Sequence, residues 1–395
     1  MTDFARTRAA FHLPAGVTYL DGNSLGPMPL AAAARVQRMM AAEWGDMLIG
    51  GWNGAGWYDQ PRRTGDRIAR LIGAGAGEVV MGDTLSIKVF QALSAALALR
   101  PGRRVILTDS GNFPSDIYVA QGLGDALDAQ VRVVEPLALA GALTDDVAVL
   151  MVTEVDYRSG YRHDMAELTR RAHAAGALTI WDLAHSAGAV DTDVTAAGAD
   201  FAVGCTYKYL NGGPGAPAFI RVAPHLADQA RPILQGWMGH RLPFAFEQDY
   251  HAAPGIERMR VGTPPILALA ALDAALDIWD EVDMAALRAR SIELTGAFIG
   301  AVESACPGLE LVTPRDPARR GSQVSFRHPQ AYAVMQALIA QGVIGDFRAP
   351  DVLRFGFAPL YNTLDDVHRA AQVLGQILAG KSWDRPAFHA RAQVT

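Results

Sequence analysis

The chain has 395 residues, a length that one ordinary hydrophobic core does not organise, so we expect a large domain with a smaller partner. Half of the residues are hydrophobic and 19% are charged, which excludes a disordered chain. The formal net charge of -6, without a basic stripe, argues against nucleic-acid binding. The two cysteines, Cys205 and Cys306, are too few for a disulfide framework or a zinc site, and they favour a reducing cytoplasm.

The first residues, MTDFARTRAAFHLPAG, contain no continuous apolar core, so we expect no signal peptide. The long apolar run ILALAALDAALDIW, which starts at Ile266, is interrupted by aspartates and is too short to cross a bilayer. We therefore expect a cytoplasmic protein that does not contact a membrane and needs no metal.

Short runs rich in Val and Ile alternate with Ala-rich helical stretches over most of the chain. Residues 81–99 read as the end of a strand that turns into a helix, with Val89, Leu93 and Leu97 on its buried face. A second helix is expected over 164–177, with Gly176 as its stop signal. Further strands are expected at 104–109, 131–134, 147–153, 178–183 and 200–206. Such apolar strands between helices predict an α/β fold whose mostly parallel sheet carries helices on both faces.

The pattern changes after GTPP at 262–265. A long helical segment starts at Ile266, and the runs 321–328 and 351–362 read as strands of a small α+β unit. The expected parts are an N-terminal segment that packs with the small domain, a large domain and a small C-terminal domain, at 1–45, 46–270 and 271–395.

Polar side chains follow several of the predicted strands. Asp182 and His185 come after one strand, Lys208 comes after the next, and Phe113 and Asp116 follow the run 104–109. The carboxyl ends of strands are where open α/β sheets bind ligands. Taken alone, each residue has an ordinary explanation, because a strand-end Asp is usually a turn residue and a lysine is usually a solvated surface amine.

The combination of these residues predicts pyridoxal phosphate as the cofactor. Lys208 is suited to form a Schiff base with the aldehyde, and Asp182 is suited to keep the pyridine nitrogen protonated. The helix that starts near Thr84 and Ser86 offers free N–H groups and a positive dipole end to the phosphate. The Gly-rich stretch 73–78 precedes a strand instead of following one, so we interpret it as a plain loop.

The chain resembles the kynureninases of bacterial type, which are pyridoxal-phosphate enzymes of fold type I in the class V aminotransferase superfamily. The motifs run in order over almost the whole chain, and YLDGNSLG and GWMGH are much more specific than the Asp and Lys pair. The residues that carry the resemblance are YLDGNSLGPMP (19–29), MGDTLSIKVFQAL (81–93), GNFPSDIY (111–118), WDLAHSAGA (181–189), GCTYKYLNGGPGAP (204–217), GWMGH (236–240), VGTPPIL (261–267) and LRFGFAPLYNTLDDV (353–367).

The resemblance implies roles for individual residues. Lys208, Asp182 and Tyr207 would be catalytic, with Tyr207 as a proton relay, and Arg354 would clamp the α-carboxylate of the substrate. Because an unpaired charge in an apolar strand is costly, some anion should meet Arg354. The implied cofactor contacts are Leu85, Ser86, Phe113, Asp116, Thr153, Asp182, His185, Tyr207, Lys208, Trp237 and Thr263.

Two of these contacts, Trp237 and Thr263, would reach into the partner subunit's site, which implies a homodimer with shared active sites. The implied reaction is hydrolysis of the Cβ–Cγ bond of L-kynurenine, or also of 3-hydroxykynurenine, to anthranilate and L-alanine in tryptophan catabolism. Thr263 favours the substrate without the hydroxyl group, because animal-type members carry Asn there. The segment 50–59 is expected to supply part of the aryl pocket, with Trp52 and Trp57 as candidates.

Two alternatives share the fold. A cysteine desulfurase or selenocysteine lyase needs a nucleophilic Cys on a mobile loop, whereas Cys306 lies at the expected end of a helix without a Ser/Gly-rich loop around it. A class V aminotransferase would keep the same cofactor residues and would differ only in its products. A non-catalytic protein of this fold typically loses the lysine or the carboxylate clamp, and Lys208, Asp182 and Arg354 are all present here.

Overall fold

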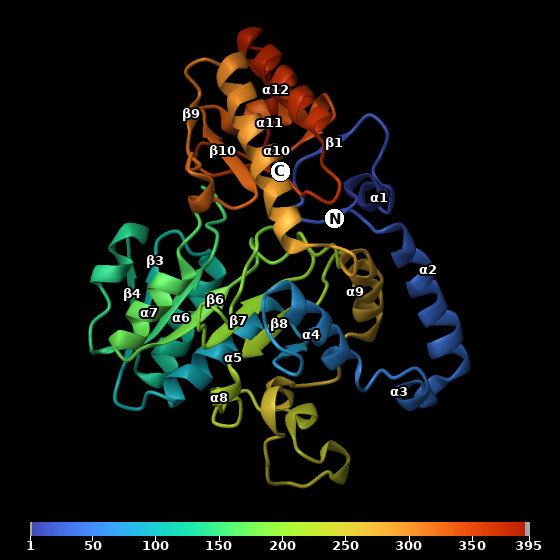
Figure 1. The fold of residues 1–395 in the computed structure, drawn as a ribbon, viewed down its shortest axis with the longest axis vertical. Helices are drawn as coiled ribbons and strands as arrows, with labels where there is room; N and C mark the ends of the chain where they lie inside the picture. Colours follow the sequence, from blue (N-terminus) through green and yellow to red (C-terminus); the bar gives the residue numbers. More distant parts are fainter. Residues whose placement is uncertain (1, 392–395) are drawn as a thin grey trace.

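A seven-stranded sheet organises the larger part of the chain in the computed structural model, which describes residues 2–391 (Figure 1). Its strand order is β2-β8-β7-β6-β5-β3-β4. The strands are β2 (Val79–Met81), β3 (Val105–Asp109), β4 (Gln130–Val134), β5 (Val147–Thr153), β6 (Leu178–Asp182), β7 (Phe201–Gly204) and β8 (Phe219–Val222).

The strands from β7 through β6, β5 and β3 to β4 all pair in parallel, and only β8 runs antiparallel to its neighbours β2 and β7. The predicted mostly parallel sheet is therefore confirmed. Every residue of β5 is buried, which explains its uninterrupted apolar sequence, because helices cover both faces of the sheet.

Neighbouring residues of each strand point into two different cores. Ile180 of β6 packs with Val89 and Leu93 of α5 on one face, whereas Trp181 packs with residues of α4 and α9 on the other. The predicted buried face of α5 is thus confirmed. The helices of this part are α4 (Gln60–Leu71), α5 (Leu85–Ala98), α6 (Pro114–Leu127), α7 (Met165–Ala174), α8 (Pro224–Ala227) and α9 (Ile266–Trp279).

The smaller part, at the top of Figure 1, is built on an antiparallel sheet of order β12-β13-β10-β9. Its core contains four buried phenylalanines, of which Phe298 lies 5.0 Å from the ring centroids of both Phe355 and Phe357. The elements are α10 (Met284–Ala305), β9 (Glu310–Leu311), β10 (Gln323–Arg327), α11 (Ala331–Ala340), β11 (Val343–Ile344), β12 (Asp346–Arg348), β13 (Val352–Gly356), α12 (Leu364–Ala379) and α13 (Pro386–His389).

The N-terminal segment contacts both parts of the molecule. Its strand β1 (Thr18–Tyr19) pairs in parallel with β11, and Leu20 enters the core of the smaller part. The other elements before α4 are α1 (Phe4–Ala9), α2 (Leu30–Arg38), a π-helix (Met39–Asp46), a 3-10 helix (Leu48–Gly50) and α3 (Gly51–Gly54). Helix α2 packs against α9, which itself crosses the expected boundary between 270 and 271. The division at 45 and 270 stays a prediction.

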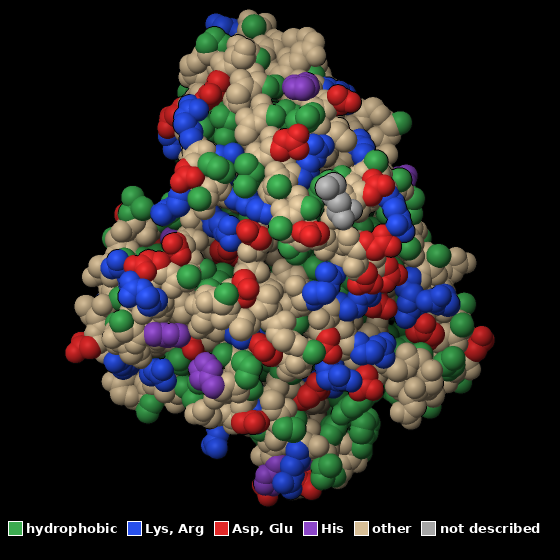
Figure 2. Space-filling model, viewed as in Figure 1, with side chains coloured by type: hydrophobic (Ala, Val, Ile, Leu, Met, Phe, Trp, Pro, Cys, Tyr) green, Lys and Arg blue, Asp and Glu red, His purple; other side chains and the backbone are tan. Residues whose placement is uncertain are grey.

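The surface carries charges of both signs. Acidic and basic side chains are interspersed over the face shown in Figure 2. Within residues 2–391, no helix is both long enough and apolar enough to span a lipid bilayer. The same residues contain no group of three or more His, Cys, Asp or Glu side chains that could hold a metal ion.

Candidate active site

Lys208 lies in the turn between β7 and β8, where four of the predicted site residues meet. Its Nζ atom is 2.9 Å from Nε2 of His185, which follows β6. The same Nζ is 5.9 Å from the ring centroid of Phe113 and 5.8 Å from that of Tyr207. Because β6 and β7 are adjacent and parallel, their carboxyl ends bring the two polar side chains together.

Two buried carboxylates complete this group. Asp182 ends β6 and accepts a hydrogen bond of 2.9 Å from the Ala184 N–H. Burial raises the pKa of Asp182 to about 6, although Lys208 and the Ala184 N–H act against this shift. Burial, and then the charge of Asp182, raises the pKa of Asp116 well above its ordinary value, against the effect of Lys208. Two carboxyl groups therefore share one cation, an arrangement that favours a further proton or a protonated ring nitrogen.

Several polar atoms of this group are buried without a hydrogen-bond partner among the described residues. They are Oδ2 of Asp116, Nδ1 of His185 and Oγ of Ser186. Burial, and then the charges of Lys208, Arg354 and Arg348, lowers the pKa of His185 well below its ordinary value, so its ring is neutral. Buried polar atoms are rarely left unpaired, and these offer donors and acceptors to a polar aromatic ring. The residues present therefore fit a pyridoxal cofactor.

The start of α5 is suited to bind an anion. Thr84 is the N-cap residue, but no side chain caps the N–H groups of the first turn, to which Leu85 and Ser86 belong. Both residues are partly exposed. A 14-residue helix with free N–H groups at its positive end matches the phosphate of the predicted cofactor.

Two predicted contacts lie apart from this group, and a third, Thr153, lies beside it without a side chain directed to it. Thr153 pairs in register with Asp182, but its hydroxyl donates to the Val155 carbonyl at 3.2 Å and so serves the backbone. Trp237 and Thr263 are exposed, and in the described part of the chain neither shares a hydrogen bond or a cation–ring contact with Lys208. Trp237 belongs to the segment between β8 and α9 that projects at the bottom of Figure 1. Their contribution to a partner's site stays a prediction.

Arg354 of β13 is buried at the junction of the two parts. Its Nη1 donates to the Tyr157 carbonyl, in the loop after β5, at 2.7 Å. Its Nη2 donates to Ser24 Oγ at 2.6 Å and to Asp346 Oδ2 at 2.5 Å, and Asp21 lies 3.9 Å away. The expectation that an anion meets this guanidinium is supported by Asp346, which faces Arg354 across the β12–β13 pair.

The residues around Arg354 were missed by the sequence reasoning. Asp346 also pairs with Arg348 at 2.5 Å, so one carboxylate joins two arginines. Burial, and then Asp346, raises the pKa of Asp21 to about 7, with Arg354 acting in the opposite direction. Asp21 and Ser24 belong to the motif YLDGNSLG, which was the available signal, although its spacing does not reveal a contact more than 300 residues away.

The same motif packs against the backbone of the Lys208 turn. The Gly26 N–H donates to the Tyr207 carbonyl at 2.8 Å. A Cβ atom at Gly26 would lie 2.4 Å from the Lys208 carbonyl oxygen, so only glycine fits. The N-terminal segment is therefore part of the wall that holds Lys208 in place.

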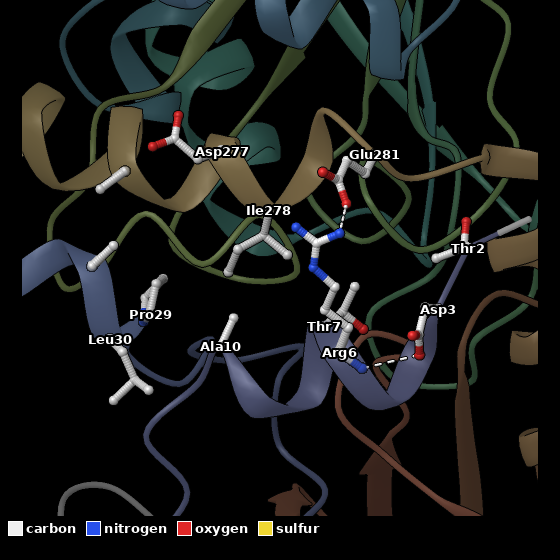
Figure 3. A pocket seen from close by; sticks show the side chains of 12 residues that line it. Thr2, Asp3, Arg6, Thr7, Ala10, Pro29, Leu30, Asp277, Ile278 and Glu281 are labelled. Atoms are coloured by element: carbon white, nitrogen blue, oxygen red, sulfur yellow. Dashed lines mark hydrogen bonds and ion pairs between the residues drawn. The ribbon is translucent and has the colours of Figure 1, made fainter.

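A separate cavity of about 440 Å³ lies between α1, the start of α2 and the end of α9 (Figure 3). Arg6 pairs with Glu281 across it at 2.7 Å. None of the predicted site residues lines this cavity. The candidate active site is therefore the group around Lys208.

Solved structures show which fold the chain shares. A cysteine desulfurase from Thermococcus onnurineus NA1 has a TM-score of 0.81 at 19% identity, covering 96% of this chain and 99% of that chain. A C-DES variant with glycine covalently linked to its PLP cofactor has a TM-score of 0.79 at 17% identity, covering 95% and 99%. The chain has the fold type I architecture of pyridoxal-phosphate-dependent enzymes.

Sequence relatives identify the family within that class. Kynureninase from Pseudomonas fluorescens is 53% identical over 99% of this chain and 96% of its own length. Kynureninase from Burkholderia pseudomallei (strain 1106a) is 52% identical with the same coverage. Residues 287–374 match the family model of the kynureninase C-terminal domain. The chain belongs to the kynureninase family.

Proposed function

We propose that this protein hydrolyses the Cβ–Cγ bond of L-kynurenine to give anthranilate and L-alanine, with pyridoxal phosphate as its cofactor. The observation that carries the proposal is the identity of more than half with a kynureninase over nearly the whole chain. The group around Lys208 supports it, because an amine, a buried carboxylate and an aromatic ring lie together there.

Different residues would hold different parts of the cofactor. Lys208 would bind its aldehyde, Asp182 its ring nitrogen and Phe113 its ring face, while the first turn of α5 would bind its phosphate. When bound, pyridoxal phosphate supplies an electron sink that stabilises negative charge on the substrate carbons next to the amino group. The pairing of Asp182 with a protonated nitrogen would strengthen that effect, since it keeps the positive charge in the ring.

Proton transfer is the task of Lys208 and Tyr207. Once its amine is free, Lys208 can take the α-proton of the substrate. His185, 2.9 Å away, is neutral and so places no second positive charge beside this amine. Burial, followed by Cys205, raises the pKa of Tyr207 above its ordinary value, so its phenol stays protonated at neutral pH. A protonated phenol next to Lys208 is suited to give a proton to the departing carbon.

Arg354 would orient the substrate through its α-carboxylate. Tyr157, Ser24 and Asp346 fix the plane of the guanidinium from three sides. A planar, pre-oriented guanidinium binds a carboxylate with two parallel hydrogen bonds and at low entropic cost.

The substrate without the hydroxyl group is the proposed preference, on the basis of Thr263. We also propose a cytoplasmic homodimer in which Trp237 and Thr263 of each subunit reach the partner's site, since both side chains are exposed. The N-terminal segment, large domain and small domain are proposed to divide at residues 45 and 270. A desulfurase is not favoured, because both cysteines are buried and neither is an exposed nucleophile.

The test measures anthranilate fluorescence and alanine from L-kynurenine in parallel, after supplying the purified protein with pyridoxal phosphate. We expect equal amounts of both products, and reduction with borohydride should fix the cofactor on the peptide that contains Lys208. Lys208→Ala should abolish both signals, whereas the exposed Lys381→Ala is the matched control and should change neither. Cofactor fixed on another lysine, or turnover by Lys208→Ala, contradicts the proposal.

A further inference from the structure

Lys88 is a buried cation outside the group around Lys208. The chain contains only three lysines, at 88, 208 and 381, although Lys and Arg together number 35. Lys88 lies on α5, and its side chain has no exposed surface. Burying an ammonium group is costly unless it is fully paired, so its partners indicate its task.

The Lys88 ammonium makes three contacts, one for each of its hydrogens. Its Nζ lies 2.9 Å from Gln91 Oε1, 2.9 Å from the Met259 carbonyl oxygen and 3.3 Å from Asp83 Oδ2. A Cβ atom on Gly82 would lie 3.7 Å from the same Nζ. The ammonium therefore lies next to the turn 82–84, which leads into the first turn of α5.

Asp83 places a negative charge next to the helix start at which the cofactor phosphate is expected. It immediately precedes the N-cap Thr84, and its backbone is held at φ +56°. The Asp83 carbonyl accepts a 3.0 Å hydrogen bond from the Ala218 N–H, so the turn is tied to the start of β8. A carboxylate fixed beside a helix start repels a dianionic phosphate unless a cation compensates it.

We propose that Lys88 is a positioning residue of the phosphate site: its ammonium compensates Asp83 and ties the turn 82–84 to Met259. This inference rests on the proposed function, because it assumes that the chain binds pyridoxal phosphate. The contact with Met259 also joins the phosphate turn to the segment that carries Thr263, four residues further along the chain.

The charge state of Lys88 is compatible with this role. Burial lowers the pKa of Lys88 to about 8, with Asp83 acting against the shift and Arg260 adding to it. The ammonium form thus predominates at neutral pH, where it compensates Asp83.

The experiment compares binding of pyridoxal phosphate, and of pyridoxal without its phosphate, to the cofactor-free protein and its variants by absorbance titration. Lys88→Met should raise the dissociation constant of pyridoxal phosphate at least tenfold. The dissociation constant of pyridoxal should stay within threefold of the wild-type value. The double variant Asp83→Asn/Lys88→Met also removes the uncompensated carboxylate. Its dissociation constant for pyridoxal phosphate should return to within threefold of the wild-type value. Equal loss for both ligands, no loss, or no rescue overturns the inference.

Asp83→Asn alone keeps the inference testable if Lys88→Met does not fold, because the Asp83 side chain is 32% exposed and the substitution keeps its size. If Lys88 serves to compensate the repulsion between Asp83 and the phosphate, this variant should bind pyridoxal phosphate no more weakly than wild type. A purely structural ion pair predicts weaker binding, and a loss of more than threefold overturns the inference. If the wild-type protein takes up no cofactor, the proposed function itself is refuted. If the wild type binds pyridoxal phosphate and Lys88→Met binds it equally well, only this inference is refuted.

Discussion

Replacing Asp21 with Asn should stabilise the protein at pH 8 and have little effect at pH 4. Asp21 lies close to Arg354, its side chain is only 19% exposed, and burial together with Asp346 raises its pKa to about 7 from 3.8. Between these two values the folded protein holds a proton that the unfolded chain has lost. The free energy of unfolding therefore falls as the pH rises through this window.

The size of the effect follows from the two pKa values. Their difference corresponds to about 4 kcal/mol once the pH exceeds 7, since each pKa unit is worth about 1.4 kcal/mol. Asparagine carries no charge at any pH, so the free energy of unfolding of Asp21→Asn does not fall in this way as the pH rises. The difference in unfolding free energy between variant and wild type should thus grow from near zero at pH 4 to about 4 kcal/mol at pH 8.

Urea unfolding of the cofactor-free protein at one-unit steps from pH 4 to pH 8 measures this difference. The matched control is Asp145→Asn, which removes a carboxylate from an exposed position. If the Asp21→Asn difference stays constant, or shrinks as the pH rises, the reasoning about burial and Asp346 is wrong.

Three further substitutions test the proposed roles. Arg354→Lys replaces the planar fork and should cost about 2 kcal/mol of substrate binding, seen as a roughly 30-fold rise in KM for L-kynurenine; an unchanged KM contradicts the clamp. Tyr207→Phe should lower the single-turnover rate constant of cleavage by about 10²-fold or more, and an undiminished rate refutes the relay. Thr263→Asn should shift the ratio of kcat/KM toward 3-hydroxykynurenine, and an unchanged ratio removes Thr263 from substrate selection.

The fold was largely predictable because the central strands of its large sheet are buried on both faces. Uninterrupted apolar runs such as that of β5 occur only where helices cover both faces, so strand positions and parallel pairing followed from the pattern. The meeting of His185 and Lys208 followed as well, since parallel neighbours end at the same edge of a sheet.

Contacts between distant parts of the chain could not be predicted in the same way. Asp21 and Arg354 are 333 positions apart in the sequence, and only the packing of β1 beside the smaller part brings them together. Lys88 falls within the helix predicted in 81–99, but nothing in the local pattern shows that its ammonium turns inward to Asp83 and Met259. Trp237 and Thr263 lie outside the group around Lys208, so a single chain does not reveal their role.

The most direct test of the central claim offers the same holoenzyme L-kynurenine and L-cysteine in separate reactions. The solved structures that share the fold include a cysteine desulfurase, whereas the sequence relatives are kynureninases, and the products separate the two activities. We expect anthranilate and alanine in equal amounts from L-kynurenine, and no sulfide from L-cysteine. Sulfide release without anthranilate, from protein that carries the cofactor on Lys208, would contradict the account.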